Sequence, residues 1–143
     1  MDEHIKMNIT RLVSNSNTAV VSSVDNNYFP NMKAMFIAKH EGIRTFWFST
    51  NVSSARFDQW KNCHNAGIYL CDSQSIHGLM LLGLMDIYTD DKTKADFWHE
   101  GDEKYYPLGP TDPDYCIIRF TAKGGNYWEN EKYTLDSSLI QEI

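Results

Sequence analysis

The chain has 143 residues, a formal net charge of -6, and 42% hydrophobic and 13% aromatic residues. This length and composition predict one ordered globular domain over residues 1–143. The acidic balance argues against a nucleic-acid partner, because binding a phosphate backbone needs clustered Lys and Arg.

The sequence predicts neither export nor membrane insertion. The N-terminus carries early acidic charge and lacks the apolar run of a secretory signal. The longest uncharged apolar stretch, residues 73–85, is shorter than a membrane span of about 20 residues. Cys63, Cys71 and Cys116 have no CxxC spacing, which suits reduced thiols. We therefore expect a cytoplasmic protein with no membrane contact.

Hydrophobic periodicity and turn residues predict a series of short elements. Ile5, Ile9 and Leu12 recur at helical spacing, and residues 25–27 have the composition of a hairpin turn. The expected elements are a helix over 3–14, strands over 18–24, 30–38 and 45–49, a helix over 53–63, strands over 66–71 and 76–88, a helix over 91–99, a long loop rich in proline and glycine, and strands over 115–121 and around 127–128. The first three strands are expected to pair in sequence, antiparallel. About six strands with few helices predict a mainly β, small antiparallel barrel.

The strand expected over residues 76–88 is apolar on both faces. Its apolar residues are Leu79, Leu81 and Met85 on one face and Met80, Leu82 and Leu84 on the other. An antiparallel sheet normally exposes one face to water. This strand therefore predicts a barrel interior on one side and a covering helix or second subunit on the other, and a homodimer is the expectation.

The stretch FWFSTNVSSARF, residues 46–57, runs from an aromatic strand into small polar residues and an arginine. One interpretation is a strand, a turn and an ordinary capped helix, with Ser53 or Ser54 as the cap. The other is an anion pocket, because the first turn of a helix offers free N–H groups and Arg56 adds a planar donor fork. Both interpretations stay open on these residues alone.

Other motifs give no support to further classes of chemistry. GxSxG, GxxxxGK[ST] and GxGxxG are absent, which leaves acyl-transfer, P-loop and Rossmann functions without a motif. His40, His64, His77 and His99 lack the spacing of metal ligands, so no metal site is expected. No side chain is an evident acid, base or nucleophile.

The order of the parts resembles the pyridoxamine-phosphate-oxidase-like FMN-binding split barrels, and their general stress protein 26 branch in particular. The resemblance covers residues 3–130 and includes YFPNMKAMFIA, FWFSTNVSSARF, the glycine-containing fifth strand and YYPLGPTDPDYCIIRFTAKGGNYW. The Pro-x-Gly-Pro-x-Asp-Pro run in the last stretch is its most specific part. The resemblance implies a six-stranded antiparallel split β-barrel of Greek-key type.

The same resemblance implies FMN as the cofactor, bound at the boundary between two subunits. The implied binding residues are Lys33, Ser49, Thr50, Ser54 and Arg56 for the phosphate, the backbone around Ala34, Met35 and Phe36 for the ring, and Trp128 of the neighbouring subunit as a ring contact. Two positions depart from the family. Its helix often has two adjacent basic residues, whereas Ala55 precedes Arg56 here, and its oxidases have a glutamine near the position of Gly78.

The function implied is a flavin-dependent oxidoreductase of unknown substrate. The alternative is a non-catalytic stress-response module that binds flavin, or haem or deazaflavin as other similar barrels do. Pyridoxamine-phosphate oxidation itself is not expected. The second basic position of the oxidases' FMN-binding strand is Ala38 here, and the closing YTLDSSLIQEI lacks their arginine and histidine residues.

Overall fold

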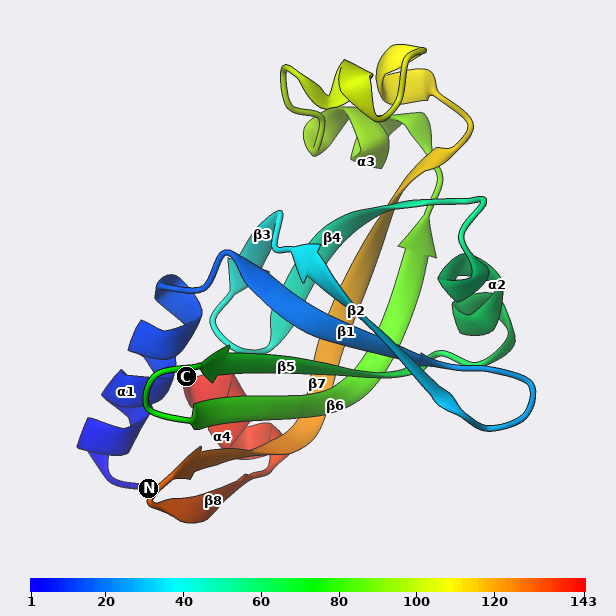
Figure 1. Cartoon of the computed structure of the whole chain (residues 1–143). Coiled ribbons are helices and arrows are strands. Elements are labelled where there is room, and N and C mark those ends of the chain that lie inside the picture. The colour runs from blue at the N-terminus through cyan, green and yellow to red at the C-terminus, as the bar shows by residue number, and fades with distance from the viewer.

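The computed structural model describes residues 1–143 and shows a mainly β protein with a strongly curled sheet (Figure 1). The strands are β1 (Thr18–Val24), β2 (Pro30–Phe36), β3 (Lys39–Glu41), β4 (Thr45–Asn51), β5 (Asn65–Asp72), β6 (His77–Tyr88), β7 (Tyr115–Glu129) and β8 (Glu131–Leu135). The helices are α1 (Glu3–Ser14), α2 (Ala55–Asn62), α3 (Asp91–Asp96) and α4 (Ser137–Glu142), with short 3-10 turns η1 (Asp102–Lys104) and η2 (Gly109–Thr111). No helix is long and apolar enough to cross a membrane.

The strands form one antiparallel sheet in the order β2-β1-β5-β6-β7-β4-β3, with β8 added beside β7. The sheet curls until Ala38, just past β2, donates its N–H to the carbonyl of Trp47 on β4 at 2.8 Å. The predicted fold class, a mainly β split barrel, is confirmed. Eight strands replace the six expected, because β3 and β8 are additional short strands.

The expected sequential pairing of the first three strands holds only for the β1–β2 hairpin. β4 pairs with β7 and with the short β3 instead of with β2. β4 does not pair with β2 because the chain leaves β2 after Phe36 and forms β3, which pairs with β4 first. The end of β2 and the middle of β4 therefore face each other across a gap that no full ladder closes.

Side chains on the inward faces of the strands fill the barrel interior, and buried side chains of helix α1 pack against them. Large buried side chains come from β4 and β7, among them Phe46, Phe48 and Phe120. Ile5 and Ile9 of α1 are buried against this core, as their helical spacing predicted. Burying such side chains is the main stabilising contribution to a fold of this kind.

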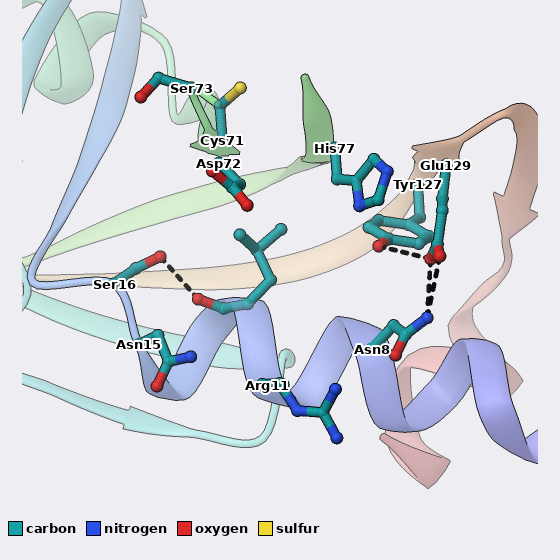
Figure 2. Close-up of a pocket in the computed structure, with 11 residues that line it drawn as sticks. Asn8, Arg11, Asn15, Ser16, Cys71, Asp72, Ser73, His77, Tyr127 and Glu129 are labelled. Atoms are coloured by element: carbon teal, nitrogen blue, oxygen red, sulfur yellow. Dashed lines mark hydrogen bonds between the residues drawn. The ribbon is translucent and has the colours of Figure 1, made fainter. Parts of the chain in front are cut away.

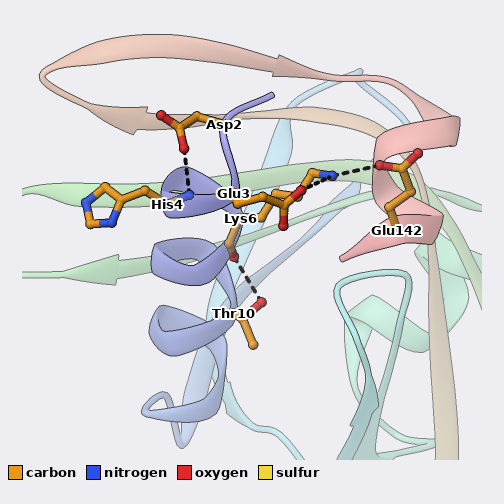
Figure 3. Close-up of polar contacts among 6 residues, drawn as sticks. All are labelled: Asp2, Glu3, His4, Lys6, Thr10 and Glu142. Atoms are coloured by element: carbon orange, nitrogen blue, oxygen red, sulfur yellow. Dashed lines mark hydrogen bonds and ion pairs between the residues drawn. The ribbon is translucent and has the colours of Figure 1, made fainter.

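Polar contacts at the N-terminus fasten α1 to α4 (Figure 3). Asp2 caps α1 by accepting the N–H of His4 at 2.8 Å. Lys6 donates to Glu142 of α4 at 2.9 Å and to Glu3 at 3.3 Å, and these two carboxylates raise the pKa of Lys6. An exposed ion pair adds little stability, so the apolar face of α1 holds the helix in place.

β7 is one continuous strand, whereas the sequence predicted a break before residues 127–128. Leu82 of β6 pairs with Gly124 while Gly83 pairs with Ala122, so Lys123 is an extra residue, a β-bulge. A Cβ on Gly83 would overlap the carbonyl oxygen of Thr121, so the glycine allows the close approach at the bulge. The expected break rested on Gly124-Gly125, and both glycines pair with β6 within the continuous strand.

Residues 89–114 leave the barrel between β6 and β7 and form a separate small lobe, here called the excursion (Figure 1). It contains α3, which is shorter than the expected helix over 91–99, followed by η1 and η2. The excursion packs through a second small aromatic cluster, in which the rings of Tyr106 and Tyr115 lie 4.9 Å apart between centroids. Phe97 stacks on Trp47 of β4 at 6.0 Å, which places the lobe beside that strand.

Candidate functional site

Two sizeable hollows are candidates for a ligand site, and the first lies beside α1 (Figure 2). It has a volume of about 580 Å³. Its carboxylates already have partners in the chain: Glu129 accepts from Asn8 and from the hydroxyl of Tyr127, and Asp72 accepts from Ser75. No buried polar atom in this hollow lacks a partner. Nothing in its chemistry points to a ligand.

The second hollow, here called the β2–β4 cavity, has a volume of about 530 Å³, which is within the usual range for small-molecule sites. Three segments meet around it: β2 with the two residues after it, the end of β4 with α2, and the excursion. Its lining residues are Lys33, Ala34, Met35, Phe36, Ile37, Ala38, Ser49, Thr50, Asn51, Arg56, Phe97, His99, Asp102, Tyr105 and Tyr106.

The polar part of the lining of the β2–β4 cavity, formed by Lys33, Ser49, Thr50 and Arg56 and here called the anion end, is suited to an anion. Arg56 and Lys33 carry the positive charge of this lining, and Ser49 and Thr50 add hydroxyl groups. The Nε atom of Arg56 is buried and has no hydrogen-bond partner. Leaving a buried donor unpaired costs about 1–3 kcal/mol, more for a charged group. An acceptor from a ligand would remove this cost, and a phosphate has the charge and geometry for it.

Helix α2 places Arg56 at the cavity. Trp60, fully buried, donates its ring N–H to the carbonyl of Ser22 at 3.2 Å and anchors the helix against β1. Arg56 lies in the first turn, where the backbone amides have no carbonyl partner within the helix and the helix dipole favours negative charge. The capped helix is therefore observed, and its first turn borders the cavity, while the anion pocket stays a prediction.

The cavity wall formed by β2 presents backbone hydrogen-bonding groups to a ligand more than it presents side chains. Met35 is buried toward the core opposite Ala19, whereas Phe36 is 77% exposed on the outer side of the sheet. Within the sheet β2 pairs only with β1, so backbone N–H and C=O groups on its other edge are free to bind a ligand.

The excursion supplies the outer wall, which sequence reasoning did not assign. Phe97, His99, Asp102, Tyr105 and Tyr106 line it. The Nδ1 atom of His99 lies 2.9 Å from the carbonyl oxygen of Phe97. A carbonyl only accepts, so Nδ1 carries the proton and Nε2 of the neutral ring is left as an acceptor. The aromatic pair in the YYPLG segment was a signal for this wall, but its place in space depends on tertiary packing.

The structure brings together seven of the nine residues that the sequence assigned to the site. Lys33, Ala34, Met35, Phe36, Ser49, Thr50 and Arg56 all line the β2–β4 cavity. Ser54 does not, because its hydroxyl caps α2 by accepting the N–H of Phe57 at 3.4 Å. Trp128 lies beside Gly78 on the outer face of the sheet and is 46% exposed, away from the cavity of its own chain.

The curled sheet with a cation-bearing cavity beside its open edge defines a split-barrel protein. Residues 4–141 match the family described as pyridoxamine 5'-phosphate oxidase like, and the chain belongs to that family. The solved structure of a protein from Clostridium acetobutylicum, related to general stress protein 26 of B. subtilis, is 37% identical. It has a TM-score of 0.87, and the match covers 98% of this chain and 99% of that one.

Two more distant structures share the fold. A pyridoxamine 5'-phosphate oxidase-related, FMN-binding protein from Nostoc punctiforme is 12% identical with a TM-score of 0.63, covering 92% of this chain and 86% of that one. A haem-binding protein from Mycobacterium smegmatis is 10% identical with a TM-score of 0.75, covering 96% and 60% respectively. No curated protein sequence matches the chain.

Proposed function

We propose that this protein binds FMN in the β2–β4 cavity and acts as a flavin-dependent oxidoreductase whose substrate is not identified. The observation that carries the proposal is the buried, unpartnered Nε of Arg56 at one end of the cavity. The family and the FMN-binding relative from Nostoc punctiforme support the choice of flavin over other phosphorylated ligands.

The residues present fit such a ligand. Arg56 and Lys33 would hold the phosphate with charge-assisted hydrogen bonds, and the hydroxyls of Ser49 and Thr50 would add neutral ones. The exposed backbone edge of β2 from Ala34 to Phe36 would lie along the ring. When bound, FMN supplies the hydride and single-electron chemistry that no side chain of this chain offers.

The excursion would serve the substrate side of the site. Tyr105 and Phe97 place aromatic surface at the rim, which excludes water from a bound ring. His99 presents Nε2 as a proton acceptor, because its Nδ1 is engaged with the carbonyl of Phe97. A proton released or taken up by a substrate at this site would have an imidazole within the cavity wall to exchange with.

A homodimer is part of the proposal, and the outer face of the sheet supports it. Ala34, Val20, Tyr69 and Met80 lie side by side across β2, β1, β5 and β6. The large exposed apolar residues of this face are Val20, Met32, Phe36, Tyr69, Leu82, Leu84 and Trp128. An apolar surface of this extent is typical of a protein interface. No helix of the chain buries Leu82, which is 50% exposed.

The position of Phe36 links the proposed dimer to the proposed site. Its side chain belongs to the exposed apolar face and also lines the β2–β4 cavity. A second copy seated on this face would meet the edge of the cavity and cover it. Trp128 of a neighbouring copy could then contact the ring, which is the role that the family resemblance gives it.

Two alternatives stay open within the same fold. One is a flavin-binding stress-response module without turnover, which needs the cavity but no substrate. The other is haem binding, which the relative from Mycobacterium smegmatis supports. His99 and Tyr105 are residue types that ligate haem iron, and both line the cavity. The propionates of a haem would then lie near Arg56.

Cytoplasmic location is proposed on the chemistry of the cysteines. Cys63, Cys71 and Cys116 are all free thiols in the structure. Free thiols persist in a reducing compartment.

The absorption spectrum of the purified protein separates these functions. Bound flavin is expected, with added FMN raising the melting temperature of the apoprotein, because a ligand at 100 times its Kd stabilises the native state by about 2.7 kcal/mol. A haem spectrum would favour the haem alternative. A melting curve that saturating FMN leaves unmoved would contradict the flavin assignment, and flavin binding with no turnover of reduced nicotinamides or quinones would favour the non-catalytic module.

A further inference from the structure

Three hydrogen bonds join Asp114, at the end of the excursion, to the β4–α2 loop (residues 51–54). The carboxylate of Asp114 accepts the side-chain amide of Asn51 at 2.7 Å and the backbone N–H of Ser53 at 2.8 Å. Its backbone carbonyl accepts the N–H of Val52 at 2.8 Å. Asp114 thus contacts three successive residues of a loop that is more than 60 residues away in the chain.

The β4–α2 loop connects the polar residues of the anion end of the cavity. Thr50 precedes it on β4, and Arg56 follows it in the first turn of α2. Any shift of the loop therefore changes the spacing between the hydroxyl and the guanidinium. Asn51 is also a lining residue, whereas Asp114 is not, so Asp114 acts on the cavity only through the loop.

Asp114 is itself held by the Pro-x-Gly-Pro-x-Asp-Pro run that precedes it. The buried carboxylate of Asp112 accepts the N–H of Asp114 at 2.9 Å and that of Leu108 at 3.2 Å. Lys94 of α3, also buried, donates its ammonium to the carbonyl of Asp112 at 2.9 Å. Gly109 takes a φ of 83°, which closes the run into a compact turn. The run is thus built to hold one carboxylate in a fixed place.

We propose that Asp114 is a positioning residue of the anion site, fixing the β4–α2 loop so that Thr50 and Arg56 converge on one phosphate group. This inference rests on the proposed function for the identity of the phosphate. It assigns a role to a sequence run that neither the barrel core nor the cavity lining explains. The position of the anion end would then depend on the excursion, through the hydrogen bonds of Asp114.

The charge state of Asp114 is consistent with this role. The hydrogen bonds from Asn51 and from the N–H of Ser53 lower the pKa of Asp114, so the group is an acceptor-only carboxylate at neutral pH. The hydroxyl of Tyr106 reinforces the arrangement from the excursion side by donating to the side-chain oxygen of Asn51 at 3.4 Å.

The test compares Asp114→Ala with a control that loses the same kind of bond elsewhere. Asp136→Ala is that control, since Asp136 accepts the backbone N–H of Leu139 at 2.9 Å at the start of α4, away from the cavity. Affinities for FMN and riboflavin are measured by titration calorimetry. We expect Asp114→Ala to lower the affinity for FMN about tenfold or more, while the affinity for riboflavin changes less than about twofold. Asp136→Ala is expected to change neither, and Asp114→Asn to fall between the wild type and Asp114→Ala.

A second measurement keeps this inference separate from the flavin assignment. Inorganic phosphate is titrated while the amide signals of Ala55 and Arg56 are followed by nuclear magnetic resonance. If the wild type binds phosphate but not FMN, and Asp114→Ala abolishes the phosphate response, the positioning role stands and the flavin assignment fails. Equal losses of FMN and riboflavin affinity in Asp114→Ala, unchanged FMN affinity, or no phosphate response in the wild type would each overturn the positioning role.

Discussion

The hydroxyl of Tyr69 lies directly over Gly78 of the neighbouring strand, in the place that a Cβ at position 78 would occupy. Both residues belong to the outer side of the β5–β6 hairpin, where Gly78 pairs with Cys71. The oxidases that this chain resembles have a glutamine near this position. Here any side chain at position 78 requires Tyr69 to move first.

Two glycine substitutions on β6 are expected to differ in cost. Gly78→Ala meets only the Tyr69 side chain, which is 41% exposed, so the loss should be under about 1 kcal/mol. Gly83→Ala meets the backbone carbonyl of Thr121 and should lose about 3 kcal/mol. Urea unfolding of both variants measures the difference. Equal losses would mean that the backbone at the bulge is not fixed as described.

The aromatic cluster under the excursion should make the protein sensitive to alkali. Burial raises the pKa of Tyr106, Tyr115 and Cys116 to about 12 each, from ordinary values of 10.0 for the phenols and 9.0 for the thiol. The unfolded chain ionises first, so their contribution to stability is full below about pH 9 and is lost as pH rises toward about 12. The free energy of unfolding should therefore fall between about pH 9 and about pH 12.

Variants test which groups cause this alkaline loss. Tyr115→Phe removes one buried phenol and should flatten the decline between about pH 9 and about pH 12. Tyr28→Phe is the matched control, because this ring is 88% exposed in the β1–β2 turn. An identical pH dependence in the wild type and Tyr115→Phe would show that the phenol is not the source.

The apolar outer face makes the dimer testable by a single charge. Leu82→Asp places a carboxylate among the exposed apolar residues of that face, and a buried unpaired charge at an interface is strongly unfavourable. We expect the wild type to sediment as a dimer at micromolar concentration and Leu82→Asp as a monomer. Leu108→Asp is the control, since Leu108 is 71% exposed on the excursion. A wild type that is monomeric at micromolar concentration would refute the proposed dimer.

Local patterns predicted most of the fold, and the misses have physical causes. The helix over 3–14 and the hairpin at 25–27 follow from periodicity and turn residues that need no tertiary information. One long strand was predicted as two because Gly124-Gly125 looked like a break, whereas both glycines pair with β6 next to the bulge at Lys123. β8 and α4 went unpredicted, since both are short and each rests on the body of the barrel.

The candidate site was predictable where it follows a motif and not where it depends on packing. Arg56 and Thr50 belong to one continuous stretch whose polar residues stand out, and both line the cavity. His99 and Tyr105 line the same cavity only because the excursion folds back beside β4. Ser54 was assigned to the ligand, but its hydroxyl is used by the helix it caps.

Pyridoxamine-phosphate oxidation is expected to be absent even when FMN is bound. Ala38 lines the cavity where a second cation would serve the substrate phosphate, and the C-terminal residues form β8 and α4 at the other end of the barrel (Figure 1). Each missing charge-assisted hydrogen bond weakens the binding of the substrate phosphate by about 1.5–3 kcal/mol. The protein is saturated with FMN and assayed for oxygen-dependent formation of pyridoxal phosphate. Turnover at ordinary enzyme rates would refute this prediction.

The central claim is that Arg56 holds the phosphate of a bound FMN, and titration calorimetry of FMN against riboflavin tests it most directly. Arg56→Ala should weaken FMN binding by about 1.5–3 kcal/mol, roughly 10-fold to 100-fold in affinity. The affinity for riboflavin should stay nearly unchanged, because only FMN carries the phosphate. Arg11→Ala, on α1 and outside the β2–β4 cavity, should change neither affinity. Equal weakening of FMN and riboflavin by Arg56→Ala, or no FMN binding by the wild type, would contradict the claim.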